Sequence, residues 1–163
     1  MERIPLKGIS FIIILIFVSI FPIGCKNYEA KKHYKLGKKL VDQGKNEEAI
    51  KEFKESIKLN PNNPKVHYRI GQIYLKLDKY DDAIDYFEQS LKIDPLRGDS
   101  YENLVKAYIA KGEKDKALAA CERALTKIDD IKVKDELKKI SDQLIEEINK
   151  DQEEKLKNKE KSQ

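Results

Sequence analysis

The sequence repeats itself with a period of 34 residues. Apolar residues recur at this interval in three copies, as Leu36, Ile70 and Leu104, and as Ala49, Ala83 and Ala117. Four further pairs keep the same offset: Gly37 and Gly71, Phe53 and Phe87, Ser56 and Ser90, Pro61 and Pro95. A constant period of this length is typical of proteins that stack one small supersecondary unit on the next. The chain is therefore expected to be a row of similar modules.

Each module is expected to form two helices joined by a short turn. In the middle module, one face is formed at i, i+3, i+4 and i+7 spacing by His67, Ile70, Gly71 and Tyr74. A second set with inward spacing follows: Ala83, Phe87, Ser90 and Leu91. Asn63 and Pro64 suit the start of the first helix, and Pro95 prevents continuation of the second. Each module is thus predicted to be an antiparallel helix pair.

These residues resemble the tetratricopeptide repeat, whose motif places Leu and Gly together, then Tyr, Ala, Phe or Tyr, Ala and Pro at fixed positions. The matching units are residues 30–63, 64–97 and 98–131. The third unit departs from the motif, with Val105 at the glycine position, Cys121 at the aromatic position and Asp129 at the proline position. The resemblance implies an all-α fold, a solenoid of three antiparallel helix pairs. Cys121 is interpreted as a small buried hydrophobe.

A capping helix is expected after the third unit. Apolar residues continue at helical spacing as Val133, Leu137, Ile140, Leu144 and Ile148. A repeat array needs such a cap because its last helix pair would otherwise expose an apolar face. We therefore predict a capping helix over residues 132–150, followed by a charged tail, residues 151–163, that frays or stays disordered.

The first 24 residues have the layout of a signal peptide. Arg3 and Lys7 precede an apolar run from residue 9 to residue 21. A membrane-spanning helix needs roughly 20 apolar residues, so this run favours export over a permanent span.

Gly24 and Cys25 resemble the lipobox of bacterial lipoproteins, although Pro22 stands where that family usually has Leu. The resemblance implies that Cys25 receives a diacylglyceryl thioether and becomes the mature N-terminus, tethered to the repeats by residues 25–29. By the same resemblance, Lys26 in place of an Asp directly after the cysteine favours the outer over the inner membrane. The alternatives are an ordinary secreted protein and an uncleaved anchor.

Composition argues against catalysis and nucleic-acid binding. The chain carries 33 basic and 29 acidic side chains, interleaved, with no Trp and two His. Nucleic-acid binders are normally more one-sided in charge. The sequence offers no nucleophile motif, no Gly-rich phosphate loop and no clustered metal ligands. His33 and His67 occupy the same repeat position and are interpreted as packing residues. We therefore predict no catalytic residue, no metal and no cofactor.

A second stripe on each first helix is the candidate binding surface. In the repeat family these positions line a groove that holds a protein or peptide. The predicted groove residues are Lys31, Tyr34, Lys38, Lys65, Tyr68, Gln72, Leu75, Glu102, Lys106 and Ile109. The tyrosine rings would be open to a ligand, with long cationic side chains beside them. The alternative is that the tyrosines belong to the framework and the lysines to a solvated face.

The resemblance argues against one subtype of partner. Some family members grip an acidic chaperone tail with a carboxylate clamp of Lys, Asn and Arg. The clamp positions here hold Tyr34, Lys38, Arg69, Asp99 and Asn103. The clamp is therefore not expected.

The resulting prediction is a lipid-anchored scaffold of the bacterial envelope that binds a protein or peptide partner. Two alternatives remain open. The first is a pilotin-like or outer-membrane assembly factor, and the second is a structural lipoprotein that forms a homo-oligomer. A basic segment, residues 26–39, follows the predicted anchor and would be attracted to anionic headgroups if the first helix faces the bilayer.

Overall fold

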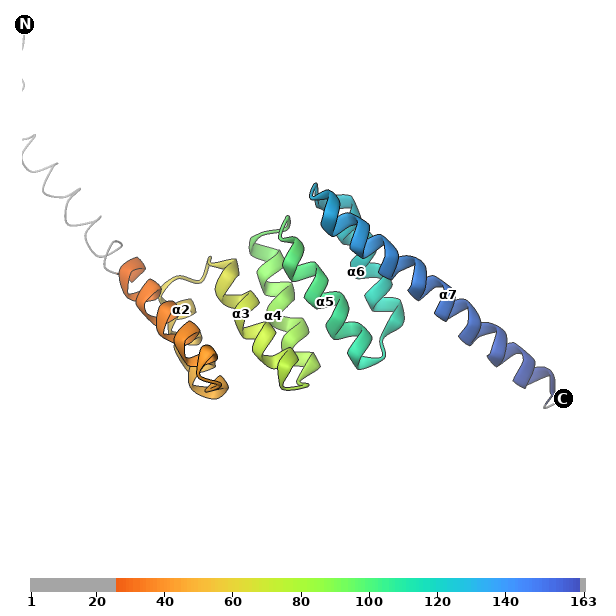
Figure 1. Ribbon diagram of the computed structural model, residues 1–163, viewed down its shortest axis with the longest axis horizontal. Coiled ribbons are helices and arrows are strands. Elements are labelled where there is room, and N and C mark those ends of the chain that lie inside the picture. Colours follow the sequence, from red (N-terminus) through yellow and green to blue (C-terminus); the bar gives the residue numbers. More distant parts are fainter. Residues whose placement is uncertain (1–25, 162–163) are drawn as a thin grey trace, which may run out of the picture. The chain divides into compact units, whose positions relative to one another are not determined.

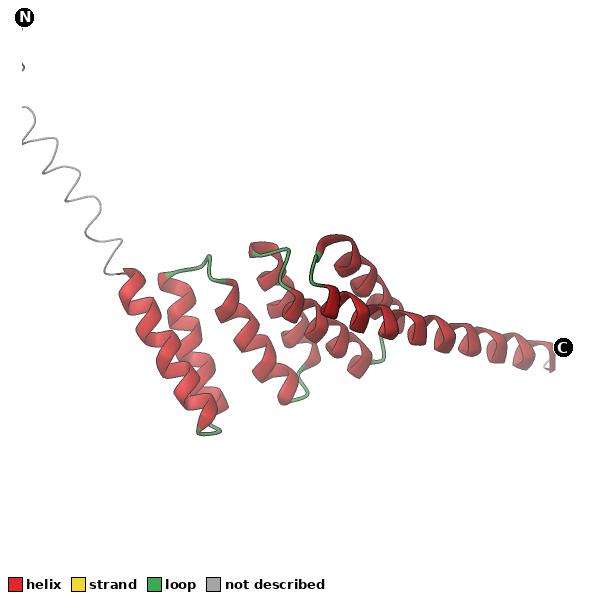
Figure 2. Ribbon diagram, turned by 45° about the horizontal axis from the view of Figure 1, so that its top comes forward, coloured by secondary structure: helices red, strands yellow, loops and turns green. Residues whose placement is uncertain are grey.

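The computed structural model describes residues 26–161, and every element in that range is an α-helix (Figure 2). The chain divides into an N-terminal unit, residues 1–62, and a C-terminal unit, residues 63–163. The predicted signal peptide and Cys25 lie outside the described residues. No helix within residues 26–161 is long and apolar enough to cross a membrane.

The N-terminal unit contains one helix pair. The described part of its N-terminal helix covers residues 26–42, and α2 spans Asn46–Leu59 (Figure 1). Gly44 in the turn has a φ of +74°, a conformation that glycine adopts without strain. A Cβ on Gly37 would lie 2.6 Å from the Phe53 ring. The glycine is therefore needed for the two helices to approach this closely.

The C-terminal unit contains the remaining five helices: α3 (Pro64–Lys76), α4 (Tyr80–Ile93), α5 (Gly98–Lys111), α6 (Lys114–Lys127) and α7 (Ile131–Lys161). The predicted start of α3 is confirmed, since the Asn63 side chain accepts a hydrogen bond from the Lys65 backbone N–H at 3.2 Å. Gly112 ends α5 in the left-handed conformation, with a φ of 81°.

These five helices pack in chain order, each against the next (Figure 1). Helix α3 also contacts α5, and α5 contacts α7, so these three lie next to one another along one side of the unit. We call this the inner side. The predicted all-α fold of three helix pairs and a C-terminal helix is confirmed. The packing of each helix against the next one in the chain is the pattern expected of a solenoid.

The third helix pair departs from the motif at two facing positions, and the change in side-chain volume at one is opposite to the change at the other. A Cβ on Gly71 would lie 2.7 Å from the Phe87 ring, so a large aromatic residue requires glycine opposite it. Val105 and Cys121 occupy the equivalent positions, and both are completely buried in the same core cluster. A larger side chain on one helix therefore coincides with a smaller one on the other.

Helix α7 covers the last helix pair and continues beyond it. Leu137 and Leu144 are buried against the core, and Ile140 packs against it while partly buried. The helix extends to Lys161, through the segment for which we predicted fraying or disorder. Residues 149–160 are exposed. The Lys114 amine lies 2.9 Å from Asp151 and 3.2 Å from Glu147, and these ion pairs hold the start of this extension beside α6.

Candidate partner-binding surface

The predicted groove residues of the C-terminal unit come from α3 and α5. On α3, Lys65 is exposed, Gln72 and Leu75 are half-buried and Tyr68 is buried. On α5, Glu102 is half-buried, while Lys106 and Ile109 are exposed. Because α3 contacts α5 and the two sets occupy the same repeat positions, both stripes belong to the inner side.

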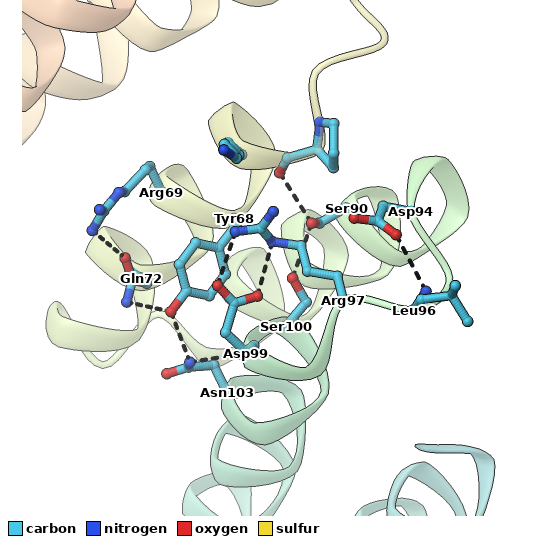
Figure 3. Close-up of polar contacts among 12 residues, drawn as sticks. Tyr68, Arg69, Gln72, Ser90, Asp94, Leu96, Arg97, Asp99, Ser100 and Asn103 are labelled. Carbon is cyan, nitrogen blue, oxygen red and sulfur yellow. Dashed lines mark hydrogen bonds and ion pairs between the residues drawn. The ribbon is translucent and has the colours of Figure 1, made fainter. Parts of the chain in front are cut away.

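The centre of this surface is a hydrogen-bond network around the Tyr68 hydroxyl (Figure 3). Gln72 Nε2 donates to the hydroxyl oxygen at 2.8 Å, and Asn103 Nδ2 donates to it from α5 at 3.3 Å. The orientation of each amide is set by another partner. Arg69 donates to Gln72 Oε1 at 3.0 Å, and Asn103 Nδ2 also donates to the Asp99 backbone carbonyl at 2.8 Å.

This arrangement determines what the Tyr68 hydroxyl can offer. Its oxygen already accepts hydrogen bonds from two N–H groups. The hydroxyl proton is not used in either bond, so it remains available for an acceptor on a binding partner. Burial, followed by the charge of Asp99, raises the pKa of Tyr68 above its ordinary value, so the proton stays on at neutral pH. The network can therefore donate a hydrogen bond to a carbonyl or carboxylate oxygen of a partner.

The Tyr68 ring is less accessible than we expected from the sequence. Its exposed fraction is 9%, because the ring packs 6.0 Å from the Phe87 ring and lies beneath the Arg97 guanidinium, 5.0 Å from its carbon. Arg97 is held in turn by two contacts of 2.8 Å with the Asp99 carboxylate (Figure 3). The expectation of an open ring is thus corrected. Tyr68 is a framework residue that contributes only its hydroxyl to the polar network.

An acidic hollow lies next to this network. It has a volume of about 530 Å³ and is formed by the start of α5 and the α6–α7 connection. Its lining includes the acidic residues Asp99, Glu102, Asp129 and Asp130, and one cation, Arg97, which pairs with Asp99. Burial, followed by the charge of Glu136, raises the pKa of Glu102. Arg97 neutralises Asp99 alone, and the three carboxylates that remain give the hollow an excess of negative charge that favours a cationic group.

The remaining predicted residues lie in the N-terminal unit. Lys31 and Lys38 are exposed on the N-terminal helix, and Tyr34 is half-buried with its ring 5.8 Å from that of Phe53. Tyr34 therefore packs on Phe53 much as Tyr68 packs on Phe87. Both tyrosines combine framework packing with a place on the predicted stripe.

The predicted stripe did not include Arg69, Arg97 or Asn103. Sequence reasoning considered Arg69 and Asn103 only as positions of the carboxylate clamp, and Arg97 precedes α5, outside the periodic pattern. Sequence reasoning also missed an ion pair on another surface, where Arg123 of α6 lies 2.6 Å from Glu88 of α4 and 5.4 Å from the Tyr101 ring centre.

The two histidines have separate surroundings. His67 is buried, with its ring 6.1 Å from that of Tyr86, as expected of a packing residue. His33 is half-buried and its Nδ1 lies 2.6 Å from Glu52. Within residues 26–161, no group of three His, Cys, Asp or Glu residues is placed to hold a metal ion.

Family models match the chain in three places. A TPR repeat model matches residues 37–78, and two tetratricopeptide repeat models match residues 64–95 and 98–126. No curated protein sequence matches the chain significantly.

Solved structures of the same fold cover about three quarters of the chain. The first TPR domain of Spaghetti, bound to an HSP90 peptide, is 24% identical, with 73% of this chain and 98% of that one covered and a TM-score of 0.62. The TPR2B domain of yeast Sti1, in a pHsp70 complex, is 22% identical, with coverages of 74% and 98% and a TM-score of 0.64. MamA is 23% identical, with coverages of 76% and 81% and a TM-score of 0.58.

At these identities the similarity supports the fold alone. Together with the three family matches and the packing of the helix pairs, it places the chain among the tetratricopeptide-repeat proteins, with three repeats followed by a C-terminal helix.

Proposed function

We propose that this protein is a lipid-anchored scaffold of the bacterial envelope that binds a protein or peptide partner on the inner side of its repeats. The observation that carries the proposal is the network around the Tyr68 hydroxyl, which is held in place before any partner arrives. Groups that are already ordered lose little conformational freedom on binding, which favours affinity. Two similar TPR structures hold an HSP90 peptide and pHsp70, which supports a peptide or protein as the partner class.

The chemistry of the surface describes the partner segment. A backbone carbonyl or side-chain oxygen of the partner would accept the Tyr68 proton, and a Lys or Arg would enter the acidic hollow beside Glu102. Asp99 occupies a clamp position that a Lys fills in clamp-type repeats, so an acidic tail is a poor fit. The proposed partner therefore presents a polar segment that carries at least one cation.

The anchor is the second part of the proposal. A lipidated Cys25 would carry more than one acyl chain, and stable attachment to a bilayer requires at least two such signals. The small-residue–cysteine pair at Gly24 and Cys25 supports this modification, and Lys26 favours the outer membrane. We assign the protein no reaction and no cofactor.

A photocrosslinking experiment in cells tests the partner site. A photoreactive amino acid is placed at exposed Lys106 on α5 and, in a separate strain, at exposed Lys65 on α3. Both strains should capture the same envelope protein. Exposed Glu122 on α6 provides the control, because α6 is not one of the helices that form the inner side.

The outcomes distinguish the rival functions. Capture of the same protein from Glu122 as efficiently as from Lys106 would contradict a site on the inner side. Crosslinks only to a second copy of this chain would favour the self-associating lipoprotein, and capture of a secretin or an outer-membrane barrel protein would favour the assembly factor.

A further inference from the structure

The N-terminal helix has an exposed face that the packing of its unit leaves uncovered. Its packing face contains buried Ala30, Gly37 and Leu40. A separate set of exposed residues recurs at intervals of three and four and so occupies another face. We call this the outer face, and its residues are Tyr28, Lys32, Lys35, Leu36 and Lys39.

Two large apolar side chains on the outer face meet solvent. Tyr28 is 70% exposed and Leu36 is 43% exposed. Leu104, at the same repeat position as Leu36, is fully buried in the C-terminal unit, where α5 packs against α4. Leu36 lies on the first described helix, and within residues 26–161 no helix covers its side chain in the way that α4 covers Leu104. An apolar position that the fold buries elsewhere is thus left open.

The charge around these side chains is strongly positive. Residues 26–39 contain six lysines and one acidic residue, Glu29. Lys32 lies 3.5 Å from Glu29, in a pair that solvent screens. Among the described residues, Lys35 and Lys39 make no ion pair. Lysines that flank exposed apolar residues on one helix face are typical of helices that lie at a lipid interface, since the cations meet phosphate groups while the apolar side chains enter the acyl boundary.

The position of this face in the chain favours a membrane as its occupant. Tyr28 is three residues from Cys25 and seven from the end of the apolar run at Phe21. At about 1.5 Å per helical residue, the outer face extends over roughly 16 Å from Tyr28 to Lys39. Either form of anchor, a lipidated cysteine or a retained apolar run, would hold this short face at the headgroups.

From these observations we propose that the outer face of the N-terminal helix binds the anionic surface of a lipid bilayer. Binding through Lys32, Lys35 and Lys39 adds an electrostatic attachment to that of the anchor, and Tyr28 and Leu36 enter the interface beside them. The proposal goes beyond the partner-binding function and does not depend on modification of Cys25. It can be tested on residues 26–163, which contain every described core residue.

Vesicle cosedimentation provides the first test. Residues 26–163 should bind vesicles containing about a third phosphatidylglycerol more strongly than vesicles of phosphatidylcholine alone, and salt near 1 M should abolish the difference, since the screening length falls to about 3 Å. The K32Q/K35Q/K39Q variant should lose about 100-fold in partition coefficient, as expected when three cations leave the surface.

The matched control removes the same charge elsewhere. K51Q/K54Q/K92Q changes three exposed lysines of α2 and α4, and its partition should fall by less than about 3-fold. Equal losses in the two variants, or no preference of the parent chain for anionic vesicles, would overturn the proposal. Dichroism spectra of all three proteins confirm that they are folded.

A fluorescence measurement then identifies the contacting face. An environment-sensitive dye on L36C should shift to shorter wavelength with anionic vesicles, while the same dye on A110C, an exposed site of α5, should not. Equal shifts at both sites would contradict binding by the outer face. If the vesicle and fluorescence results are as expected but the crosslinking test fails, only the proposed partner site is rejected.

Discussion

At the scale of single residues, buried serines join neighbouring helices, both within a pair and between one pair and the next. The Ser90 hydroxyl donates to the Pro64 carbonyl at 3.0 Å and lies 2.9 Å from the Ser100 hydroxyl. Because Ser90 has one proton, Ser100 must be the donor to Ser90. In the N-terminal unit, Ser56 donates to the Ala30 carbonyl at 2.8 Å. Serine thus adds a hydrogen bond at a position where the repeat motif has alanine.

We expect Ser90→Ala to destabilise the protein by about 1–3 kcal/mol, because it removes the acceptor for Ser100 in a fully buried site. The S90A/S100A double variant should cost less than the sum of the two single variants, since no hydroxyl is left unpaired. Urea unfolding of the three variants measures these differences. If the cost of the double variant equals the sum of the two single costs, the two hydroxyls are not coupled through a shared hydrogen bond.

Cys121 should be chemically inert in the folded protein. It is completely buried, and burial raises the pKa of its thiol to about 11, with a smaller contribution from Glu122. At pH near 8 only about one thiol in a thousand would be ionised. In a protein that consists of residues 26–163, Cys121 is the single cysteine, and a thiol reagent should therefore label it only after denaturant is added. The cysteine of an Ala119→Cys variant, at an exposed site, should react at once. Rapid labelling of Cys121 without denaturant would contradict this account.

At the scale of elements, α7 has two parts with different roles. Up to Ile148 one face of the helix, with buried Leu137 and Leu144, packs against α6, and beyond that point the helix is exposed. The extension is supported by helical ion pairs such as Lys150 with Glu146 at 2.7 Å, and by the contacts of Lys114 with Glu147 and Asp151. Exposed pairs of this kind contribute about 0–1 kcal/mol. The buried part therefore accounts for most of the stability that α7 provides.

Substitutions on the two faces of α7 test this division. Leu137→Ala should lower the free energy of unfolding by about 2–5 kcal/mol, because Leu137 is fully buried. Ile145→Ala, at a site 43% exposed, should cost about 1 kcal/mol or less. Thermal and urea unfolding followed by dichroism provide the measurement. Similar costs for the two variants would show that α7 does not cap the repeats through Leu137.

At the scale of the whole molecule, the proposed anchor, outer face and inner side would perform separate tasks along one chain. Successive helix pairs pack only against their neighbours, so a change at one end of the C-terminal unit need not disturb the other. The proposed scaffold can therefore attach to a membrane near residue 25 and bind a partner through α3 and α5 without a conformational change that links the two.

Replacement of Cys25 tests the anchor in cells. Cys25→Ala should reduce the mass of the mature protein by that of its acyl groups and move most of the protein out of the membrane fraction at high salt, because the outer face alone is screened there. Mass spectrometry and fractionation measure both effects. Membrane retention that is unchanged, with no loss of acyl mass, would reject lipidation.

The sequence alone was sufficient to predict the repeat and most of its geometry. The spacing of Gly71 and Phe87, the start of α3 at Asn63 and Pro64, and the apolar series of α7 are local patterns, and local patterns reflect the helical period directly. They determined the helix pairs, their direction and the presence of a final helix.

Only the tertiary structure decided which side chains the packing covers. Tyr68 and Leu36 both belong to periodic stripes, yet Tyr68 is enclosed by Phe87 and Arg97 while Leu36 remains 43% exposed. Asn103 joined the candidate site because α5 brings it to the Tyr68 hydroxyl from 35 positions away in the chain. Helical spacing specifies the direction in which a side chain points along its own helix. What it meets there depends on neighbouring elements, which the period of a single helix does not encode.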